Sequence, residues 1–448
     1  MKTSGKIPIS KLQRTSNLVR TGAKVGVNYL KYYGDKIVHS EEEAKERLDE
    51  NNANDIYDSL KTLKGSALKM AQMMSMEKNI MPRAYVEKFS LSQFSVPPLS
   101  APLVLKTFKR SFGKLPSQLF DKFNNHAVNA ASIGQVHQAE MSGRKLAVKI
   151  QYPGIASSIQ SDLAIVRPMA MKMFNISGEH AEKYFKEVEN KLVEETNYTL
   201  ELAQSQEVAQ SCAHLPNLRF PIYYPEYSSS EIITMDWMNG IHLSEFIQKN
   251  TDQQTANLIG QTLWDFYMYQ LHVLRKVHAD PHPGNFLISK NNEVIALDVG
   301  CMKSIPEEFY IPYFNMFESK VLHDPAQFKQ NLIALEILKH DDTDEEQSFF
   351  SQMFFDIVDC FTKPFQCETF DFSDAELFEK ITAFGEQYLK KASSLNMNAN
   401  RGSSHIIYMN RTFFGLFSLM FDLKAENIKI NNYNQFSESK RKINGIKN

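Results

Sequence analysis

The sequence predicts an α+β protein with two lobes, a small one that contains most of the strands and a larger one that is mainly helical. Residues 128–151 read as strand, loop, strand, turn and strand, with a turn at Ser142-Gly143. By contrast, residues 257–275 and 306–423 have the apolar spacing of helices. A chain of 448 residues, 43% of them apolar, can build a large core in two or three domains.

Composition and charge exclude several classes of function. The net charge of −2 and the lack of a basic, aromatic surface pattern argue against a nucleic-acid partner. No secretory signal is evident, and the late apolar stretch at residues 412–421 is too short to cross a bilayer, so it predicts a buried helix. Four cysteines without CxxC spacing indicate free thiols in a reducing compartment, and we expect a cytoplasmic protein. They are Cys212, Cys301, Cys360 and Cys367.

Residues 1–36 are basic, with a single acidic residue, Asp35, and with apolar residues between the lysines and arginines. Such a segment can make peripheral contact with the inner face of a membrane that carries anionic lipid. The same composition also suits a solvated arm or a helix packed on the body of the protein. The sequence leaves these three interpretations open.

Changes in pattern divide the chain into five parts. We expect a basic arm over residues 1–50, a helical extension over 51–115, a small lobe with a helical insert over 116–240, a helix-rich lobe over 241–430 and a loose tail over 431–448. Pro97, Pro98 and Pro102 suggest a linker within the extension. Helices are expected from about residue 162 to 210 and a strand at 231–237, in the position of a hinge.

The most informative motif is HADPHPGN at residues 278–285, which an apolar run and the triplet Asp298-Val299-Gly300 follow. An aspartate five residues before an asparagine, and then Asp-x-Gly after a hairpin, is the spacing of kinase catalytic and metal-binding loops. Asp280 would then orient or deprotonate a phosphoryl acceptor. Asn285 and Asp298 would hold Mg²⁺, because hard cations prefer oxygen ligands.

Two simpler interpretations of this motif are weaker. An ordinary proline-rich turn would leave the spacing to Asp298 as an accident. A zinc pair of His278 and His282 would need a helix, which Pro281 and Pro283 disfavour.

A kinase also needs a strand lysine that holds the α- and β-phosphates and a helix glutamate that orients it. Lys149, in LAVKIQYPG, suits the first role, and the glutamate must come from residues 187–207, where Asn197 and Glu201 share a face. The segment at 129–136 stands where a glycine-rich phosphate loop would be, with Gly134 as its one glycine. The expected nucleotide-binding residues are Ala130, Ala131, Ser132, Gly134, Val136, Lys149, Met235 and Trp237.

Together these segments resemble the UbiB/AarF family of atypical kinase-like proteins over roughly residues 50–430. ALKMAQ (67–72) resembles the family's N-terminal KxGQ motif, and EETNYTLEL (194–202) resembles its ExD helix. AASIGQVH (130–137) is similar to its alanine-rich loop. The resemblance rests on these motifs jointly with AVKIQYPG, HADPHPGN and LDVG.

The resemblance implies a protein-kinase-like bilobal fold, with a KxGQ-type helical extension and a helix-rich C-terminal lobe, that binds ATP (or ADP) and Mg²⁺. It implies an ATPase or a kinase for a small-molecule or lipid acceptor, with a role in isoprenoid quinone or lipid metabolism at a membrane. It also implies roles for single residues: a regulatory cap formed by Lys69, Gln72, Glu195 and Asn197, and a catalytic set of Asp280, Lys149 and Glu201.

The chain departs from the family pattern at two positions. The glycine of KxGQ is Ala71, and the aspartate of ExD is Asn197, which removes a charge. With the glycine-poor loop, these changes favour an alternative to the enzyme, a nucleotide-gated scaffold without catalysis. A phosphotransferase of the aminoglycoside or choline type would share the Asp-Asn-Asp pattern but would not explain ALKMAQ or AASIGQVH.

Overall fold

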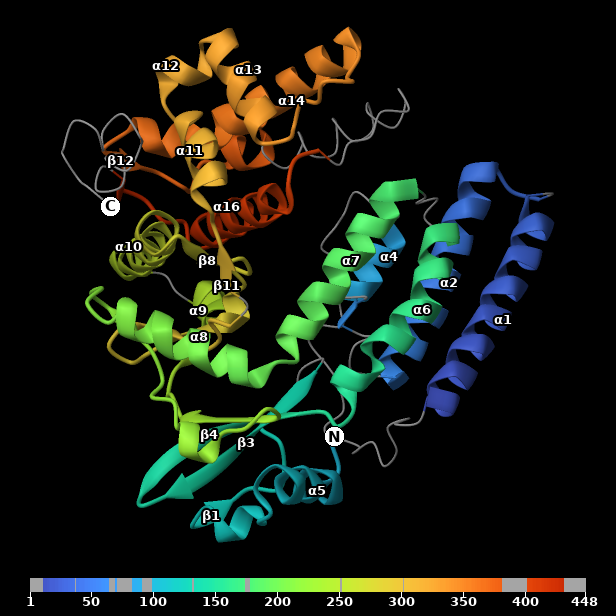
Figure 1. The fold of residues 1–448 in the computed structure, drawn as a ribbon, viewed down its shortest axis with the longest axis vertical. Helices are drawn as coiled ribbons and strands as arrows, with labels where there is room; N and C mark the ends of the chain where they lie inside the picture. The colour runs from blue at the N-terminus through green and yellow to red at the C-terminus, as the bar shows by residue number, and fades with distance from the viewer. Residues whose placement is uncertain are drawn as a thin grey trace. The chain divides into compact units, whose positions relative to one another are not determined.

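The computed structural model confirms an α+β kinase-like fold with two compact units (Figure 1). One unit contains residues 1–203 and 222–237, and the other contains 204–221 and 238–448, so the chain passes between them within helix α8 (Tyr198–Ser211). The structure describes residues 11–36, 38–63, 69–70, 83–90, 99–130, 133–173, 178–249, 252–300, 302–380 and 401–430. The predicted loose tail, Ala131, Ser132, Ala71, Gln72 and Cys301 lie outside these residues.

Helices from before and after the hairpin at residues 134–151 form one part of the first unit, and several lie side by side in Figure 1. They are α1 (Lys11–Asp35), α2 (Glu41–Leu63), α4 (Arg83–Ser90), α6 (Ile155–Met173) and α7 (Gly178–Glu195). Helix α1 packs against α2 and α6, with Val25 and Asn28 buried. Asn28 Nδ2 donates to Asn52 Oδ1 at 3.1 Å. Residues 11–35 of the predicted basic arm therefore form a helix that packs on other helices of the same unit.

An antiparallel sheet completes the first unit. Its strands are β1 (Lys122–Phe123), β2 (Asn129–Ala130), β3 (Gly134–Met141), β4 (Arg144–Gln151) and β6 (Ile232–Asp236), in the order β1-β3-β4-β6, with β2 paired to β3. Ser142 and Gly143 close the β3–β4 hairpin with φ values of 50° and 76°. Positive φ at both positions matches the twist of a two-residue hairpin turn. The hairpin was correctly predicted from Ser142-Gly143.

The predicted linker is wrong at Pro102, because this residue belongs to helix α5 (Ala101–Phe112). Pro102 lies in the first turn of this helix, where the N–H that proline lacks would have no intrahelical acceptor. Val104 and Phe108 of α5 are buried in the core beneath the sheet. A proline at a helix start and a proline in a linker look alike in sequence, and packing decides between them here.

After the chain returns to the second unit at Met238, its first helices are α9 (Leu243–Lys249) and α10 (Gln253–Tyr269). The predicted helix over 257–275 is wrong at its end, because a π-helical turn, Gln270–Leu274, follows Tyr269 and Arg275 has a φ of 55°. The π-helical turn interrupts the α-helical register, and the chain continues as strand β8 after Arg275.

The strands of the second unit form a sheet β5-β10-β9-β7 and a pair β11-β8. They are β5 (Leu218–Arg219), β7 (Ile241–His242), β8 (Lys276–His278), β9 (Phe286–Ile288), β10 (Val294–Ala296) and β11 (Met302–Ser304).

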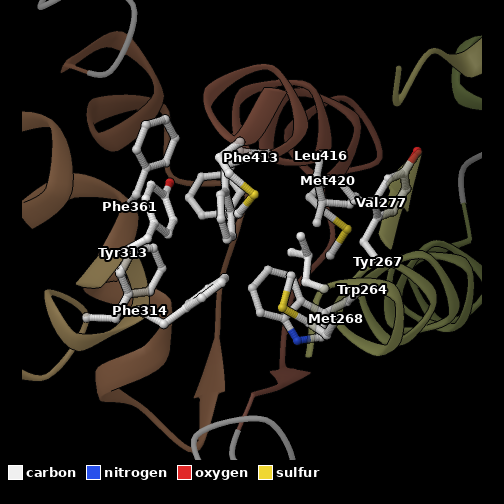
Figure 2. Close-up of a cluster of buried hydrophobic side chains, with 14 of the residues drawn as sticks. Trp264, Tyr267, Met268, Val277, Tyr313, Phe314, Phe361, Phe413, Leu416 and Met420 are labelled. Atoms are coloured by element: carbon white, nitrogen blue, oxygen red, sulfur yellow. The ribbon is translucent and has the colours of Figure 1, made fainter. Parts of the chain in front are cut away.

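The rest of the second unit is helical and aromatic, as predicted. It contains α11 (Glu307–Asn315), α12 (Ser319–Leu322), α13 (Pro325–Ala334), α14 (Asp344–Thr362), α16 (Ser404–Asp422) and a short pair of strands, β12 (Thr369–Phe370) and β13 (Ile428–Lys429). Figure 2 shows Trp264 and Met268 of α10 near Leu416 and Met420 of α16. Helix α16 is thus the buried helix expected around residues 412–421. Within the described parts of the chain, none of the helices has the length and apolar character needed to cross a membrane.

The described cysteines differ in their predicted reactivity. Burial raises the pKa of Cys212 to about 12, whereas Cys367 is exposed. Because the thiolate is the reactive form, iodoacetamide at neutral pH should label Cys367 within minutes and Cys212 only after denaturation. Peptide mass spectrometry measures this. Equal labelling of both thiols in the folded protein would contradict the packing around Cys212.

Candidate functional site

Strand β4 presents Lys149 on the face opposite to the core of its sheet. Leu146, Val148 and Ile150 are fully buried in that core, and the strand alternation places Ala147 and Lys149 on the other face. Helix α8 brings Glu201 to this lysine, with 2.5 Å between Nζ and Oε1. The side chains are only 18% and 14% exposed, so removal of either partner would leave a largely buried charge uncompensated.

Asn197 fixes the start of helix α8. Its Oδ1 accepts a hydrogen bond from the N–H of Leu200 at 3.1 Å. Just before it, the carbonyl of Thr196 accepts from Gln151 Nε2 of strand β4 at 2.9 Å. Asparagine caps a helix about as well as aspartate. The departure from ExD at Asn197 therefore keeps the capping contact that positions Glu201, although the negative charge is lost.

Gly134 is required where strands β3 and β4 meet helix α8. A Cβ at this position would lie 2.6 Å from the hydroxyl oxygen of Tyr198 and 2.8 Å from the carbonyl oxygen of Ile150. Tyr198 is fully buried, and Lys149 Nζ lies 5.1 Å from the centre of its ring. The glycine of the alanine-rich segment thus allows close packing beside Lys149.

Two other residues of that segment are part of the sheet's interior. Gln135 Oε1 accepts from the N–H of Leu99 at 2.5 Å, and His137 Nδ1 lies 2.8 Å from the carbonyl oxygen of Asn124. Burial lowers the pKa of His137, which favours a neutral imidazole. Gln135 holds the sheet to the chain before α5, and His137 holds it to the chain after β1.

An apolar cluster lies beside Lys149. It joins Val136, Met235 and Trp237 to Ala147 and Tyr223. Three of the expected nucleotide-binding residues therefore share one cluster. Ala130 pairs with Gln135 between β2 and β3. An apolar surface with one adjacent cation can bind a flat, phosphorylated ligand.

Lys69 and Glu195, two residues of the expected cap, form an ion pair. The distance between Lys69 Nζ and Glu195 Oε2 is 2.9 Å, and the side chains are 16% and 11% exposed. Glu195 ends α7 directly before the cap of α8. The pair thus connects the KxGQ-like segment to the end of α7, two residues before Asn197 at the start of α8.

In the second unit, Asn285 links the loops of Asp280 and Asp298. Its side-chain Nδ2 donates to the carbonyl oxygen of Asp280 at 3.0 Å, and its own carbonyl accepts from the N–H of Leu297 at 2.9 Å. One oxygen of Asp298, Oδ1, accepts from the N–H of Gly300 at 3.2 Å. These bonds orient both proposed metal-binding side chains.

The donor set fits Mg²⁺. The amide nitrogen of Asn285 is used by the Asp280 carbonyl, so the amide oxygen Oδ1 is directed elsewhere and can bind a cation. Mg²⁺ is commonly held by few protein oxygens and keeps several waters. Among the described residues, no group of three or more His, Cys, Asp and Glu side chains could hold a metal ion. An Asn and Asp pair completed by phosphate and water oxygens would therefore be the ligand set.

Two residues near the catalytic loop were missed in the sequence. Gln270 is fully buried in the π-helical turn, and its Oε1 accepts from the N–H of His278 at 2.8 Å. Arg411 of α16 has its Nη2 4.0 Å from Asp280 Oδ1. A break in helical register before the motif could have signalled Gln270, because π-helical turns are frequent at functional sites. No local pattern pairs Arg411 with Asp280.

The two-unit α+β fold, with a strand lysine paired to a helix glutamate and with these two loops, is that of a protein-kinase-like protein. A family profile described as "ABC1 atypical kinase-like domain" matches residues 91–332, more than half of the chain, and the chain belongs to this family. The resemblance to UbiB/AarF proteins is thereby confirmed.

The chain is similar to several curated proteins. It is 27% identical over 279 residues to Protein ACTIVITY OF BC1 COMPLEX KINASE 8, chloroplastic, of Arabidopsis thaliana, a match that covers 60% of this chain and 37% of that protein. It is 26% identical over 387 residues to Atypical kinase COQ8, mitochondrial, of Saccharomyces cerevisiae, which covers 84% of this chain and 76% of that one. The chain thus spans well under half of the first relative's length.

A solved structure has a similar fold. It is that of Rv3197 with erythromycin from Mycobacterium tuberculosis, with a TM-score of 0.55 and 22% identity over 88% of this chain and 98% of that chain. At this level of identity the similarity supports the fold alone.

The contact of Gly134 with α8 can be tested by mutation. Gly134→Ala should lower the free energy of unfolding by about 1–3 kcal/mol, because the added methyl group overpacks the β4–α8 contact. Tyr198→Phe removes one of the two close atoms and should recover part of that loss in the double variant. Urea unfolding measures both.

Gly22→Ala is a matched control, because a Cβ at Gly22 of helix α1 meets nothing within 4 Å. Alanine is the better helix former, so this change should be neutral or slightly stabilising. Equal destabilisation by both glycine substitutions would argue against the packing role of Gly134.

Proposed function

We propose that the chain is an atypical kinase or ATPase that uses ATP and Mg²⁺. The observation that carries the proposal is the Lys149–Glu201 ion pair, because an ion pair of this kind must be in place in active protein kinases. The oriented loops of Asp280, Asn285 and Asp298 support it, since they can supply the acceptor and metal contacts that the same chemistry needs.

Each residue has a role in the proposed reaction. Lys149 contacts the α- and β-phosphates and is oriented by Glu201, while the base lies against Val136, Met235 and Trp237. Asn285 and Asp298 would hold Mg²⁺, and a bound ion would neutralise phosphate charge. Asp280 orients the acceptor, a hydroxyl or water, and takes its proton.

For the acceptor, we infer a small molecule or a lipid, with a role in isoprenoid quinone or lipid metabolism. The support is the UbiB/AarF pattern of the motifs. The Lys69–Glu195 ion pair adds to it, because it links a KxGQ-like segment to the end of α7, where the ExD-like motif begins. The family shown by the comparisons is consistent with this role but does not distinguish among acceptors.

A nucleotide-gated scaffold is the second candidate. One observation favours it. Gly134 is the one glycine of the segment in the position of the phosphate loop, and it packs closely against Tyr198 and Ile150. A loop without a further glycine approaches phosphates less closely, which would suit binding without rapid turnover. Nucleotide binding and turnover therefore need to be measured separately.

The enzyme proposal is tested by ATP hydrolysis of the purified full chain with Mg²⁺. Asp298→Ala and Lys149→Met should each lower kcat/KM at least about 100-fold, because they remove metal and phosphate contacts. Chelation of Mg²⁺ with EDTA should have the same effect. Asp341→Ala, at an exposed aspartate of the same unit as Asp298, is the control and should retain full turnover.

Calorimetric titration with ATP and ADP separates the two candidates. Tight, Mg²⁺-dependent binding without hydrolysis would support the scaffold over the enzyme. Absence of nucleotide binding in the folded protein would exclude both.

We further propose that helix α1 contacts an anionic membrane surface. Val19, Val27, Leu30 and Tyr33 are 65%, 50%, 72% and 65% exposed, on the side of α1 away from the buried Val25 and Asn28. At 100° per residue, Arg20, Lys24 and Lys31 lie along one edge of this apolar stripe. An apolar stripe flanked by cations suits a helix that lies in a membrane interface.

This contact is tested with flotation of the full chain on vesicles of equal parts phosphatidylcholine and phosphatidylglycerol. The double change Val19→Glu and Leu30→Glu should abolish flotation, because it places two carboxylates in the apolar stripe. Val193→Glu, at an exposed valine of α7, should leave flotation unchanged.

Unchanged flotation of the double variant would contradict the proposal. Loss of a wild-type dimer in the same variant, without any vesicle binding of the wild type, would instead assign the stripe to a second copy of the chain.

A further inference from the structure

Helix α16 places a cation beside the aspartate of the catalytic loop. Arg411 Nη2 is 4.0 Å from Asp280 Oδ1, and the two side chains are 19% and 38% exposed. Both residues belong to the second unit. The distance exceeds that of a direct charge-assisted hydrogen bond, so Arg411 does not hold Asp280 in a bidentate pair.

The catalytic loop itself supplies no permanent positive charge. The sequence from His278 to Ser289 contains neither lysine nor arginine. His282 is used in another way, because its Nδ1 accepts from the N–H of Gly284 at 3.0 Å, which favours a neutral ring. Phosphoryl transfer spreads negative charge over the transferred group, and an arginine at that position is a known means to stabilise it. Arg411 is placed to supply that charge.

The packing of α16 fixes Arg411 against the loop. Gly415 is one turn further along the same face, and a Cβ there would lie 2.4 Å from Cγ of Pro281, so helix and loop are in close contact. Phe413, Leu416 and Met420 of α16 are buried in the core (Figure 2). A helix held by the core on one face and by Pro281 on another cannot easily move its arginine away from Asp280.

We propose that Arg411 is a further catalytic residue, whose guanidinium contacts the transferred γ-phosphoryl group. This inference rests on the proposed phosphoryl transfer. The acceptor oxygen bonds to the γ-phosphorus while the bond from that phosphorus to the β–γ bridging oxygen breaks. The electron pair of the broken bond leaves with ADP, and the acceptor proton goes to Asp280. Arg411 stabilises the charge on the equatorial oxygens throughout.

The test compares Arg411→Ala and Arg411→Lys in the full chain. In Arg411→Ala, kcat for ATP turnover should fall about 100-fold or more with little change in KM, because the contact strengthens in the transition state. Lysine should restore part of kcat, and guanidinium ion in solution should restore part of it to the alanine variant. A purely structural arginine would show no such chemical rescue.

Arg219→Gln is the matched control. Arg219 also pairs with a carboxylate in the second unit, Glu293 at 2.9 Å, but its side chain is 64% exposed. This variant should keep wild-type kcat. Wild-type kcat in Arg411→Ala, with turnover that still depends on Asp298, would overturn the role of Arg411 and leave the proposed function intact.

If the wild type does not hydrolyse ATP, nucleotide binding tests the role of Arg411 instead. The enzymatic function then fails, but a guanidinium near the γ-phosphate would still favour ATP over ADP. Calorimetry should show that this preference drops about 10-fold or more in Arg411→Ala, as expected for loss of one hydrogen bond between charged groups. An unchanged preference would overturn the inference.

Discussion

The start of helix α8 against the end of strand β4 is the contact on which the Lys149–Glu201 ion pair depends. Asn197 caps the helix, and Gln151 holds the carbonyl of Thr196. The buried ring of Tyr198, next to Lys149, can pack against Gly134 only because this residue has no side chain. With the helix fixed in this way, Glu201 meets Lys149. Close backbone packing, more than the charges themselves, sets the geometry of the ion pair.

In the second unit, a corresponding constraint is the packing of α10 and α16 on the catalytic loop. The π-helical turn at the end of α10 places Gln270 under strand β8, where it bonds the N–H of His278. Helix α16 meets the same loop at Pro281 through Gly415. The loop that carries Asp280 is therefore held by Gln270 and by α16, which packs in a core that contains many aromatic and sulfur-containing residues.

The sequence allowed much of this arrangement to be predicted. The spacing within HADPHPGN led to the two loops, and the strand pattern led to Lys149. The family resemblance then implied Glu201 as the partner in the ion pair that the structure contains. The same sequence led to a wrong interpretation of Pro102, which starts a helix, and of the end of the helix before the motif. These errors have one cause: a proline or a helical periodicity is compatible with several local structures, and burial selects one.

Short-range features were thus determined by the sequence itself: the turn at Ser142-Gly143, the order of the proposed catalytic residues and the alternation that turns Lys149 away from the core. Turn chemistry, strand period and motif spacing act over a few residues and can be read directly. The tertiary structure alone decided that Gly134 serves packing and that Arg411 lies beside Asp280. Such contacts join segments far apart in the chain, and their formation depends on how whole helices pack, which no local pattern encodes.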